Sequence, residues 1–302
     1  MRLTRLLMGG AALVLLATLS SSAAASASSK PHIIIGAANF EEQAIVANLY
    51  ADVLKHAGYP VTVDSSLGPR SIVVPALESG QIDLEADYAG TLLNYLHGNN
   101  ASLAAADNVS TAVPALKKAL SSKGVTVLTP SSALDTNVFA VTAATAKKDH
   151  LTTISSLSKY ASKMILGGPS ECPTNPGCEL GLEQTYHLHF ASFKPTDEAS
   201  TISVAALKSG EVQVVELFSS DGNVVNNHFV ALVDNKHLEP ADYITPIIRK
   251  AVDTPAVAKL INGVSAKLTT AQISKLNVLV TGPDKDAPAA VAETWLKAEH
   301  LL

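Results

Sequence analysis

The chain has 302 residues, of which 47% are of hydrophobic types, and its formal net charge is −5. This mild acidity, without a block of Lys or Arg, argues against a nucleic-acid partner and against binding to anionic membranes. The length suits one large domain or two lobes of ordinary size.

The N-terminal segment has the pattern of a secretory signal peptide. Arg2 and Arg5 precede an apolar run over residues 6–19, and a Ser/Ala-rich stretch follows that ends at Ala27. The run is shorter than the roughly 20 residues that a membrane-spanning helix needs. We therefore expect residues 1–27 to be removed and the protein to be secreted into the periplasm or the cell exterior. No Cys follows the apolar run, so we expect no lipid anchor there.

Cys172 and Cys178 are the only cysteines, and they flank a turn-rich segment that contains two Pro, an Asn and a Gly. In an exported protein this arrangement favours a structural disulfide. A zinc site that also uses His187 and His189 is the less favoured alternative. The spacing is not Cys-x-x-Cys, which argues against a redox-active pair. We expect no metal and no cofactor.

The first part of the exported chain predicts a β-α-β unit. Residues 32–36 are a β-branched run that ends in Gly, typical of a buried strand. Asn39 and Glu42 have the spacing of a capping box, and a helical apolar stripe follows that stops at Gly58. Residues 61–63 then open a second strand. This order predicts a parallel sheet with right-handed crossovers in an α/β fold.

A weak internal repeat indicates two lobes of similar topology. Residues 76–84 and 206–214 both read as a helix end, a Gly cap and a strand, at an offset of 130. The alternative is that such junctions look alike in unrelated positions. Tyr88 and Phe218 follow the two copies at the same offset. Ligands in open α/β sheets bind beyond the carboxyl ends of strands, so both rings are expected to face one shared cleft.

Several short segments, in this order, resemble the substrate-binding proteins of glycine betaine/choline/carnitine (osmoprotectant) ABC importers. They are Asn39-Phe40-Glu41-Glu42-Gln43, Ala76-Leu77 with Gly80-Gln81-Ile82-Asp83-Leu84, Asp87-Tyr88-Ala89-Gly90-Thr91, Phe218-Ser219-Ser220-Asp221-Gly222, Lys267-Leu268-Thr269-Thr270, and Val291-Ala292 with Trp295-Leu296. The resemblance spans essentially the whole chain after the signal peptide.

The resemblance implies a type II periplasmic-binding-protein fold: two α/β lobes joined by two hinge strands, with a ligand cleft between them. Lobe 1 is expected over residues 31–136 and 234–302, and lobe 2 over residues 137–233. The runs 138–141 and 229–233 are the candidate hinge strands. The lobes are expected to close around a small ligand, a quaternary amine or a related solute. The closed protein, a monomer and not an enzyme, then delivers it to a membrane permease.

The resemblance also implies the ligand-binding residues. Tyr88 is expected as one wall of an aromatic cage, with Thr91 and Gln43 as polar contacts. Phe218 lies where the family often has a Tyr, and Val138 where it commonly has another cage Tyr. The remaining candidates for ligand contact are Asn39 and Asp221, although Asp221 could instead form an Asx turn.

The chemistry of such ligands explains these residue types. A quaternary ammonium donates no hydrogen bonds, so aromatic faces must recognise it. A ligand carboxylate needs donors, which helix N-termini after Gly36 and after residues 167–168 could supply. Because the predicted cage has fewer aromatic residues than the family pattern, a neutral or aromatic solute for uptake or sensing is the alternative. An exported hydrolase is the third reading, but the sequence has no G-x-S-x-G or His-Glu-x-x-His motif.

Overall fold

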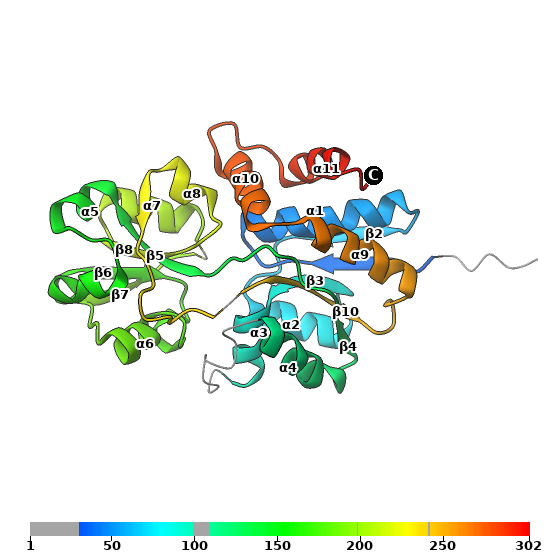
Figure 1. Cartoon of the computed structure of the whole chain (residues 1–302), viewed down its shortest axis with the longest axis horizontal. Helices are drawn as coiled ribbons and strands as arrows, with labels where there is room; N and C mark the ends of the chain where they lie inside the picture. The colour runs from blue at the N-terminus through cyan, green and yellow to red at the C-terminus, as the bar shows by residue number, and fades with distance from the viewer. Residues whose placement is uncertain (1–29, 99–108, 198, 241) are drawn as a thin grey trace, which may run out of the picture.

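The computed structural model describes residues 30–98, 109–197, 199–240 and 242–302. The predicted signal peptide, residues 1–27, lies outside this range. Two lobes lie side by side, each built on one five-stranded sheet (Figure 1). Within the described ranges, no helix is long and apolar enough to cross a membrane.

The two sheets have the same strand order. The first runs β2 (Val61–Asp64), β1 (Ile33–Gly36), β3 (Leu84–Tyr88), β10 (Ile244–Arg249), β4 (Val125–Val127). The second runs β7 (Ser192–Pro195), β6 (Ile165–Gly168), β8 (Val214–Phe218), β5 (Asn137–Thr142), β9 (Phe229–Ala231). In each sheet the first three strands are parallel and the fourth is antiparallel to its neighbours. The expected α/β fold with two similar lobes is confirmed.

Helices cover both faces of the first sheet (Figure 1). One face carries α1 (Glu41–His56), α9 (Pro255–Lys267), α10 (Thr270–Thr281) and α11 (Pro288–Ala298), and the other carries α2 (Arg70–Ser79), α3 (Ala89–Leu96) and α4 (Val109–Ser121). The second lobe holds α5 (Ala143–Asp149), α6 (Glu179–Gly181), α7 (Thr201–Ser209) and α8 (Gly222–Asn226), with 3-10 turns at Ile154–Lys159, Ala161–Lys163 and Cys172–Thr174 and a π turn at Leu182–Tyr186. Buried apolar side chains fill each layer, because a parallel sheet is stable only when both faces are covered.

The internal repeat corresponds to a repeated structure. Helices α2 and α7 end at Gly80 and Gly210, with φ values of 83° and 81°. This left-handed conformation costs a glycine little, and it closes both helices in the same way. Strands β3 and β8 follow, and each is the third strand of its sheet. The prediction of a helix end, a Gly cap and a strand is confirmed in both copies.

The candidate hinge strands lie elsewhere than expected. Residues 138–141 belong to β5, and most of 229–233 belongs to β9, and these two strands pair with each other inside the second sheet. The chain passes between the lobes just outside them, after Ala133 in the core of the first lobe and after Leu238 in the core of the second. These two crossings lie side by side, since Asp135 N donates to Asp242 O at 2.9 Å. Apolar β-branched runs mark buried strands, whereas the crossings are polar and irregular.

Cys172 and Cys178 form a disulfide, as predicted, in the loop that follows β6. Both are fully buried in the apolar core of the second lobe. The bond closes a short loop that contributes Asn175 to the wall between the lobes, and Glu171, directly before the loop, lines the same wall. Oε2 of Glu216, on β8, lies 2.6 Å from Cys178 Sγ. The disulfide therefore anchors an irregular loop next to β8.

Replacing both cysteines by serine is expected to lower the free energy of unfolding by about 2 kcal/mol, the chain-entropy estimate for so short a closed loop. Urea unfolding followed by circular dichroism measures this loss. The wild-type protein with excess reductant should unfold at the same urea concentration as the double variant. An unchanged midpoint in both samples would contradict a stabilising role for the bond.

Candidate functional site

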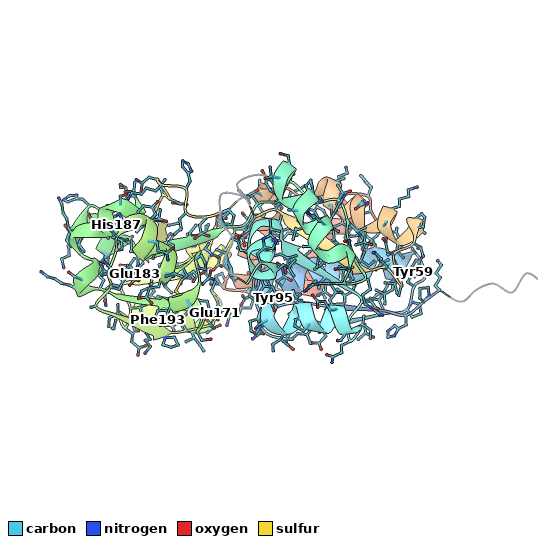
Figure 2. All side chains as sticks on the ribbon, turned by 90° about the horizontal axis from the view of Figure 1, so that it is seen from below. Tyr59, Tyr95, Glu171, Glu183, His187 and Phe193 are labelled. Atoms are coloured by element: carbon cyan, nitrogen blue, oxygen red, sulfur yellow. A yellow bond between two sulfur atoms is a disulfide. The ribbon has the colours of Figure 1, made fainter. Side chains whose placement is uncertain are left out.

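A pocket with a volume of about 110 Å³ lies between the two lobes. Its walls include Phe40, Gln43, Tyr88 and Thr91 from the first lobe and Glu171 and Phe218 from the second. Glu171 lies on the side of the second lobe that faces the first (Figure 2). The pocket is at the carboxyl ends of β3 and β8, where the repeat predicted it.

Three aromatic rings form one wall of the pocket. Phe40, directly before α1, lies between the other two: its ring centroid is 6.3 Å from that of Tyr88 and 4.9 Å from that of Phe218. The Tyr88 and Phe218 rings therefore approach one another across the lobes through Phe40. Phe40 belongs to one of the segments that resemble the family, but it was not among the predicted ligand contacts. Its position before a helix resembles that of any apolar residue at a strand–helix turn.

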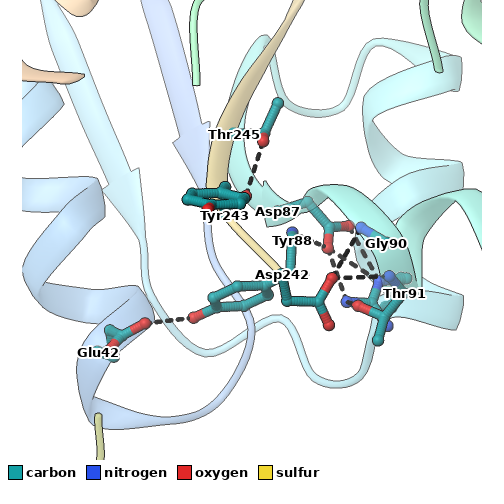
Figure 3. Close-up of polar contacts among 9 residues, drawn as sticks. Glu42, Asp87, Tyr88, Gly90, Thr91, Asp242, Tyr243 and Thr245 are labelled. Atoms are coloured by element: carbon teal, nitrogen blue, oxygen red, sulfur yellow. Dashed lines mark hydrogen bonds and ion pairs between the residues drawn. The ribbon is translucent and has the colours of Figure 1, made fainter. Parts of the chain in front are cut away.

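A buried carboxylate orients the Tyr88 ring. The Tyr88 hydroxyl donates to Glu42 Oε1 at 2.7 Å, as Figure 3 shows. Tyr88 is 8% exposed, and it belongs to the apolar core of the first lobe as well as to the pocket wall. Burial, followed by the nearby charges of Glu42 and Asp135, raises the pKa of Tyr88 well above its ordinary value. The phenol is therefore a neutral hydrogen-bond donor.

Glu42 also connects the two lobes behind the pocket. Its Oε2 accepts hydrogen bonds from Asn277 Nδ2 at 2.6 Å and from the hydroxyl of Ser220 in the second lobe. Asp135 lies nearby on the first crossing and accepts from Ser220 N at 2.7 Å. Burial raises the pKa of Glu42, and hydrogen bonds from Ser220 and Tyr88 oppose this rise. Burial and the charge of Glu42 raise the pKa of Asp135.

An ion pair forms the wall on the α2 side. The Arg70 guanidinium holds Asp87 through Nη2 at 2.7 Å and Nε at 3.0 Å, and Nη2 also donates to Thr91 Oγ1 at 2.8 Å. Asp242 lies next to this pair and accepts from the backbone N–H groups of Gly90 and Thr91 at 2.7 and 2.8 Å (Figure 3). Burial raises the pKa of Asp242 to about 7, although these two bonds and Arg70 lower it.

The structure brings four of the predicted site residues together: Gln43, Tyr88, Thr91 and Phe218 line the pocket. Asn39 is exposed and lies outside the pocket lining. It forms no capping box, because α1 begins after Phe40, which makes no side-chain cap bond. Its expected partner Glu42 turns inward instead and is buried.

Val138 and Asp221 also lie outside the pocket lining. Val138 packs against the apolar core of the second lobe, and its neighbour Asn137 lines the pocket instead. Successive side chains of a strand point to opposite faces, so a shift of one residue exchanges the two. Asp221 caps α8, where it accepts from Asn223 N at 2.7 Å. This is the Asx arrangement that the sequence left open.

The two segments expected to bind a ligand carboxylate through helix N-termini differ in structure. Helix α1 carries Glu41 and Glu42 in its first turn, which are anions themselves. After Gly168 the chain enters the disulfide loop and forms only the short 3-10 turn Cys172–Thr174. The N-terminal amides of α3 are bound by Asp242. Of the two expected positions, the one after Gly36 begins a regular helix, α1, and its N-cap residue Phe40 makes no side-chain cap bond.

The chain is similar in sequence and in fold to substrate-binding proteins. Residues 31–298 match the family model described as the substrate binding domain of an ABC-type glycine betaine transport system. A glycine-betaine-binding protein of Pseudomonas aeruginosa is 27% identical over 89% of this chain and 88% of its own. A carnitine transport binding protein of Listeria monocytogenes is 26% identical over 90% and 88%.

Among solved structures, a glycine betaine/carnitine/choline ABC transporter protein superposes with a TM-score of 0.70 at 24% identity, covering 89% of this chain and 99% of its own. Its likeness confirms the two-lobed fold. The family model covers nearly all of the residues that the structure describes. Members of this family are non-catalytic components that bind a solute and interact with a permease. This chain belongs to the family of substrate-binding proteins of ABC-type glycine betaine transport systems.

Proposed function

We propose that this protein binds a small osmoprotectant-type solute, of the glycine betaine, choline and carnitine class, and delivers it to the permease of an ABC importer. The observation that carries the proposal is the aromatic wall, in which Phe40 and Tyr88 of one lobe meet Phe218 of the other in a single pocket. A ligand held there contacts both lobes at once. Its binding energy therefore favours the closed arrangement, which the permease can distinguish from the open one.

In this proposal the moving units are residues 31–136 with 234–302 and residues 137–233, and the chain bends between them near Asp135 and Asp242. The protein acts outside the cytoplasmic membrane as a monomer. Ligand contacts come from Gln43, Tyr88, Thr91 and Phe218. A neutral or aromatic solute is the second candidate, but the carboxylates around the pocket favour a cation.

Thermal unfolding in the presence of glycine betaine, choline and carnitine tests the proposal. A ligand at 100 times its dissociation constant should stabilise the protein by about 2.7 kcal/mol, which appears as a higher Tm. A neutral aromatic compound serves as the comparison. If the neutral compound raises the Tm and none of the three osmoprotectants does, the proposed ligand class is wrong.

Phe218→Leu is expected to weaken the binding of a cationic ligand about tenfold. Leucine keeps most of the apolar contact and removes the aromatic face, whose attraction for a cation is worth about 0.5–2 kcal/mol. Isothermal titration calorimetry measures the change. Phe193→Leu is the matched control, since Phe193 lies on β7 in the second lobe and packs against that lobe's core (Figure 2). Equal affinities of the two variants would contradict the role of Phe218.

A further inference from the structure

Glu85 is a buried residue that lines the pocket between the lobes. It lies on β3, the central strand of the first sheet, and only 2% of its surface is exposed. Side chains alternate along a strand, so Glu85 shares its face of the sheet with Asp87, whereas Tyr88 lies on the other face. The pocket therefore has an aromatic wall, formed by Phe40, Tyr88 and Phe218, and a polar part at Glu85.

The Glu85 carboxyl group has an unused acceptor. Its Oε1 is buried and has no hydrogen-bond partner within the described part of the chain. The neighbouring Arg70 directs its Nε and Nη2 to Asp87 and Thr91 instead. A buried acceptor without a partner destabilises a protein, so a carboxyl group at this position points to a donor that arrives with the ligand.

The surroundings of Glu85 favour its uncharged form. Burial raises its pKa well above the ordinary value, Asp87 adds to this rise, and Arg70 opposes it. A protonated carboxyl group has one O–H donor and keeps an acceptor oxygen, and a hydroxyl group likewise donates and accepts. The two groups can therefore form a hydrogen bond in either direction without a second charge in the pocket. A ligand alkyl group at the same place would leave the Glu85 carboxyl unpaired.

The osmoprotectants of the proposed class differ in this respect. Choline and carnitine both carry a hydroxyl group on the second carbon from the quaternary nitrogen. Glycine betaine has only carboxylate oxygens at that carbon, and these accept hydrogen bonds but donate none. The trimethylammonium group, common to all three, is recognised by aromatic faces and does not distinguish among them. The hydroxyl is therefore the feature of the ligand that Oε1 of Glu85 can select.

We propose that Glu85 is a specificity-determining residue, which selects the osmoprotectants that carry a hydroxyl group two carbons from the quaternary nitrogen, as choline and carnitine do. The hydroxyl donates to Oε1 of Glu85 while the trimethylammonium group packs on the aromatic wall. This inference rests on the proposed function and narrows the ligand within the same class.

Two pairs of ligands that differ only by this hydroxyl test the inference in isothermal titration calorimetry on the wild-type protein. Choline is compared with ethyltrimethylammonium, and L-carnitine with γ-butyrobetaine. A site that hydrogen-bonds a ligand hydroxyl discriminates strongly against the analogue that lacks it, because the buried protein group is then left unpaired. We expect the hydroxyl-bearing member of each pair to bind at least about tenfold more tightly.

The outcomes separate this inference from the proposed function. If the members of a pair bind with affinities that differ less than this, the inference is overturned and the osmoprotectant proposal stands. The same holds if glycine betaine binds and neither choline nor carnitine does. If none of the quaternary ammonium compounds binds, both the inference and the proposed function fail.

Variants assign the preference to Glu85. Glu85→Leu removes the acceptor and should reduce the preference for choline over ethyltrimethylammonium to less than about threefold, whereas Glu85→Gln keeps an acceptor oxygen and should retain more of it. Glu78→Leu is the matched control, since Glu78 lies on α2 of the same lobe, is exposed and is outside the pocket lining. It should leave the preference unchanged. A Glu85→Leu protein with the wild-type preference would overturn the role of Glu85, and the ligand pairs on the wild type decide the inference even if that variant does not fold.

Discussion

Glu42→Ala is expected to lower the free energy of unfolding by about 3 kcal/mol, since it leaves several buried donors without an acceptor at about 1–3 kcal/mol each. The donors are the hydroxyls of Tyr88 and Ser220, whereas Asn277 Nδ2 loses one acceptor but still donates to Ser220 O at 3.0 Å. The loss is partly offset because the substitution also removes a buried carboxylate that repels Asp135. The loss of hydrogen bonds to several donors outweighs the removal of one repulsion, so we expect the variant to be less stable than the wild type.

The effect should extend to the arrangement of the lobes. Glu42 receives Ser220 from the second lobe, and Tyr88 takes its ring orientation from the same carboxylate. The Ala variant should therefore bind ligand more weakly in addition to unfolding more easily. Urea unfolding followed by circular dichroism gives the first effect, and calorimetric titration at a temperature where the variant is folded gives the second.

Glu41→Ala is the matched control. Glu41 is the neighbouring residue in the same helical turn, but it is only partly buried, and its carboxylate accepts a hydrogen bond from Ser200 Oγ at 2.9 Å. A loss below about 1 kcal/mol is expected for it. If Glu42→Ala lowers the free energy of unfolding no more than Glu41→Ala does, the Glu42 carboxylate does not organise this hydrogen-bond network.

The behaviour of Glu42 shows where prediction from the sequence stops. Its spacing from Asn39 suggested a local capping box, yet its partners lie 46, 178 and 235 residues away in the chain. Local patterns cannot reveal contacts of that separation. The same applies to the acidic pocket, because its carboxylates come from distant segments such as those of Glu85, Glu171 and Asp242.

Features with a local cause were predictable. The Gly-capped helix ends at Gly80 and Gly210 and the strands after them follow from short-range backbone preferences. The disulfide followed from two cysteines around a turn in an exported chain. The crossings near Asp135 and Asp242 were missed because irregular backbone has no hydrophobic period to detect.

The ligand-free protein is expected to lose stability as the pH rises from about 5 to 8, by about 2 kcal/mol from Asp242 alone. Burial raises the pKa of Asp242 from 3.8 to about 7. The folded state therefore holds a proton that the unfolded chain has already released above pH 4. The stabilisation is complete below the unfolded pKa and is lost as the pH passes through the folded pKa. Each bound proton corresponds to about 1.4 kcal/mol per pH unit within that window.

Asp221 should act in the same direction. Burial raises its pKa to about 7 as well, with the charges of Glu41 and Glu42 adding to the rise and the amide of Asn223 opposing it. Urea unfolding at pH 5, 6, 7 and 8 without ligand measures the combined slope. A free energy of unfolding that increases over this range would contradict the raised pKa values.

The variant Asp242→Asn isolates the contribution of Asp242 to the pH dependence of stability. Asparagine keeps an oxygen that can accept from the amides of Gly90 and Thr91 but cannot ionise. The variant should match the wild type at pH 5 and exceed its stability by about 2 kcal/mol at pH 8. Glu211→Gln is the control, since Glu211 is exposed and pairs with Lys194 at the surface. The wild-type protein retains a carboxylate that weakens it at neutral pH, and a cation bound in the pocket would favour the ionised form of Asp242. The stability lost at neutral pH should therefore be recovered when the cation binds.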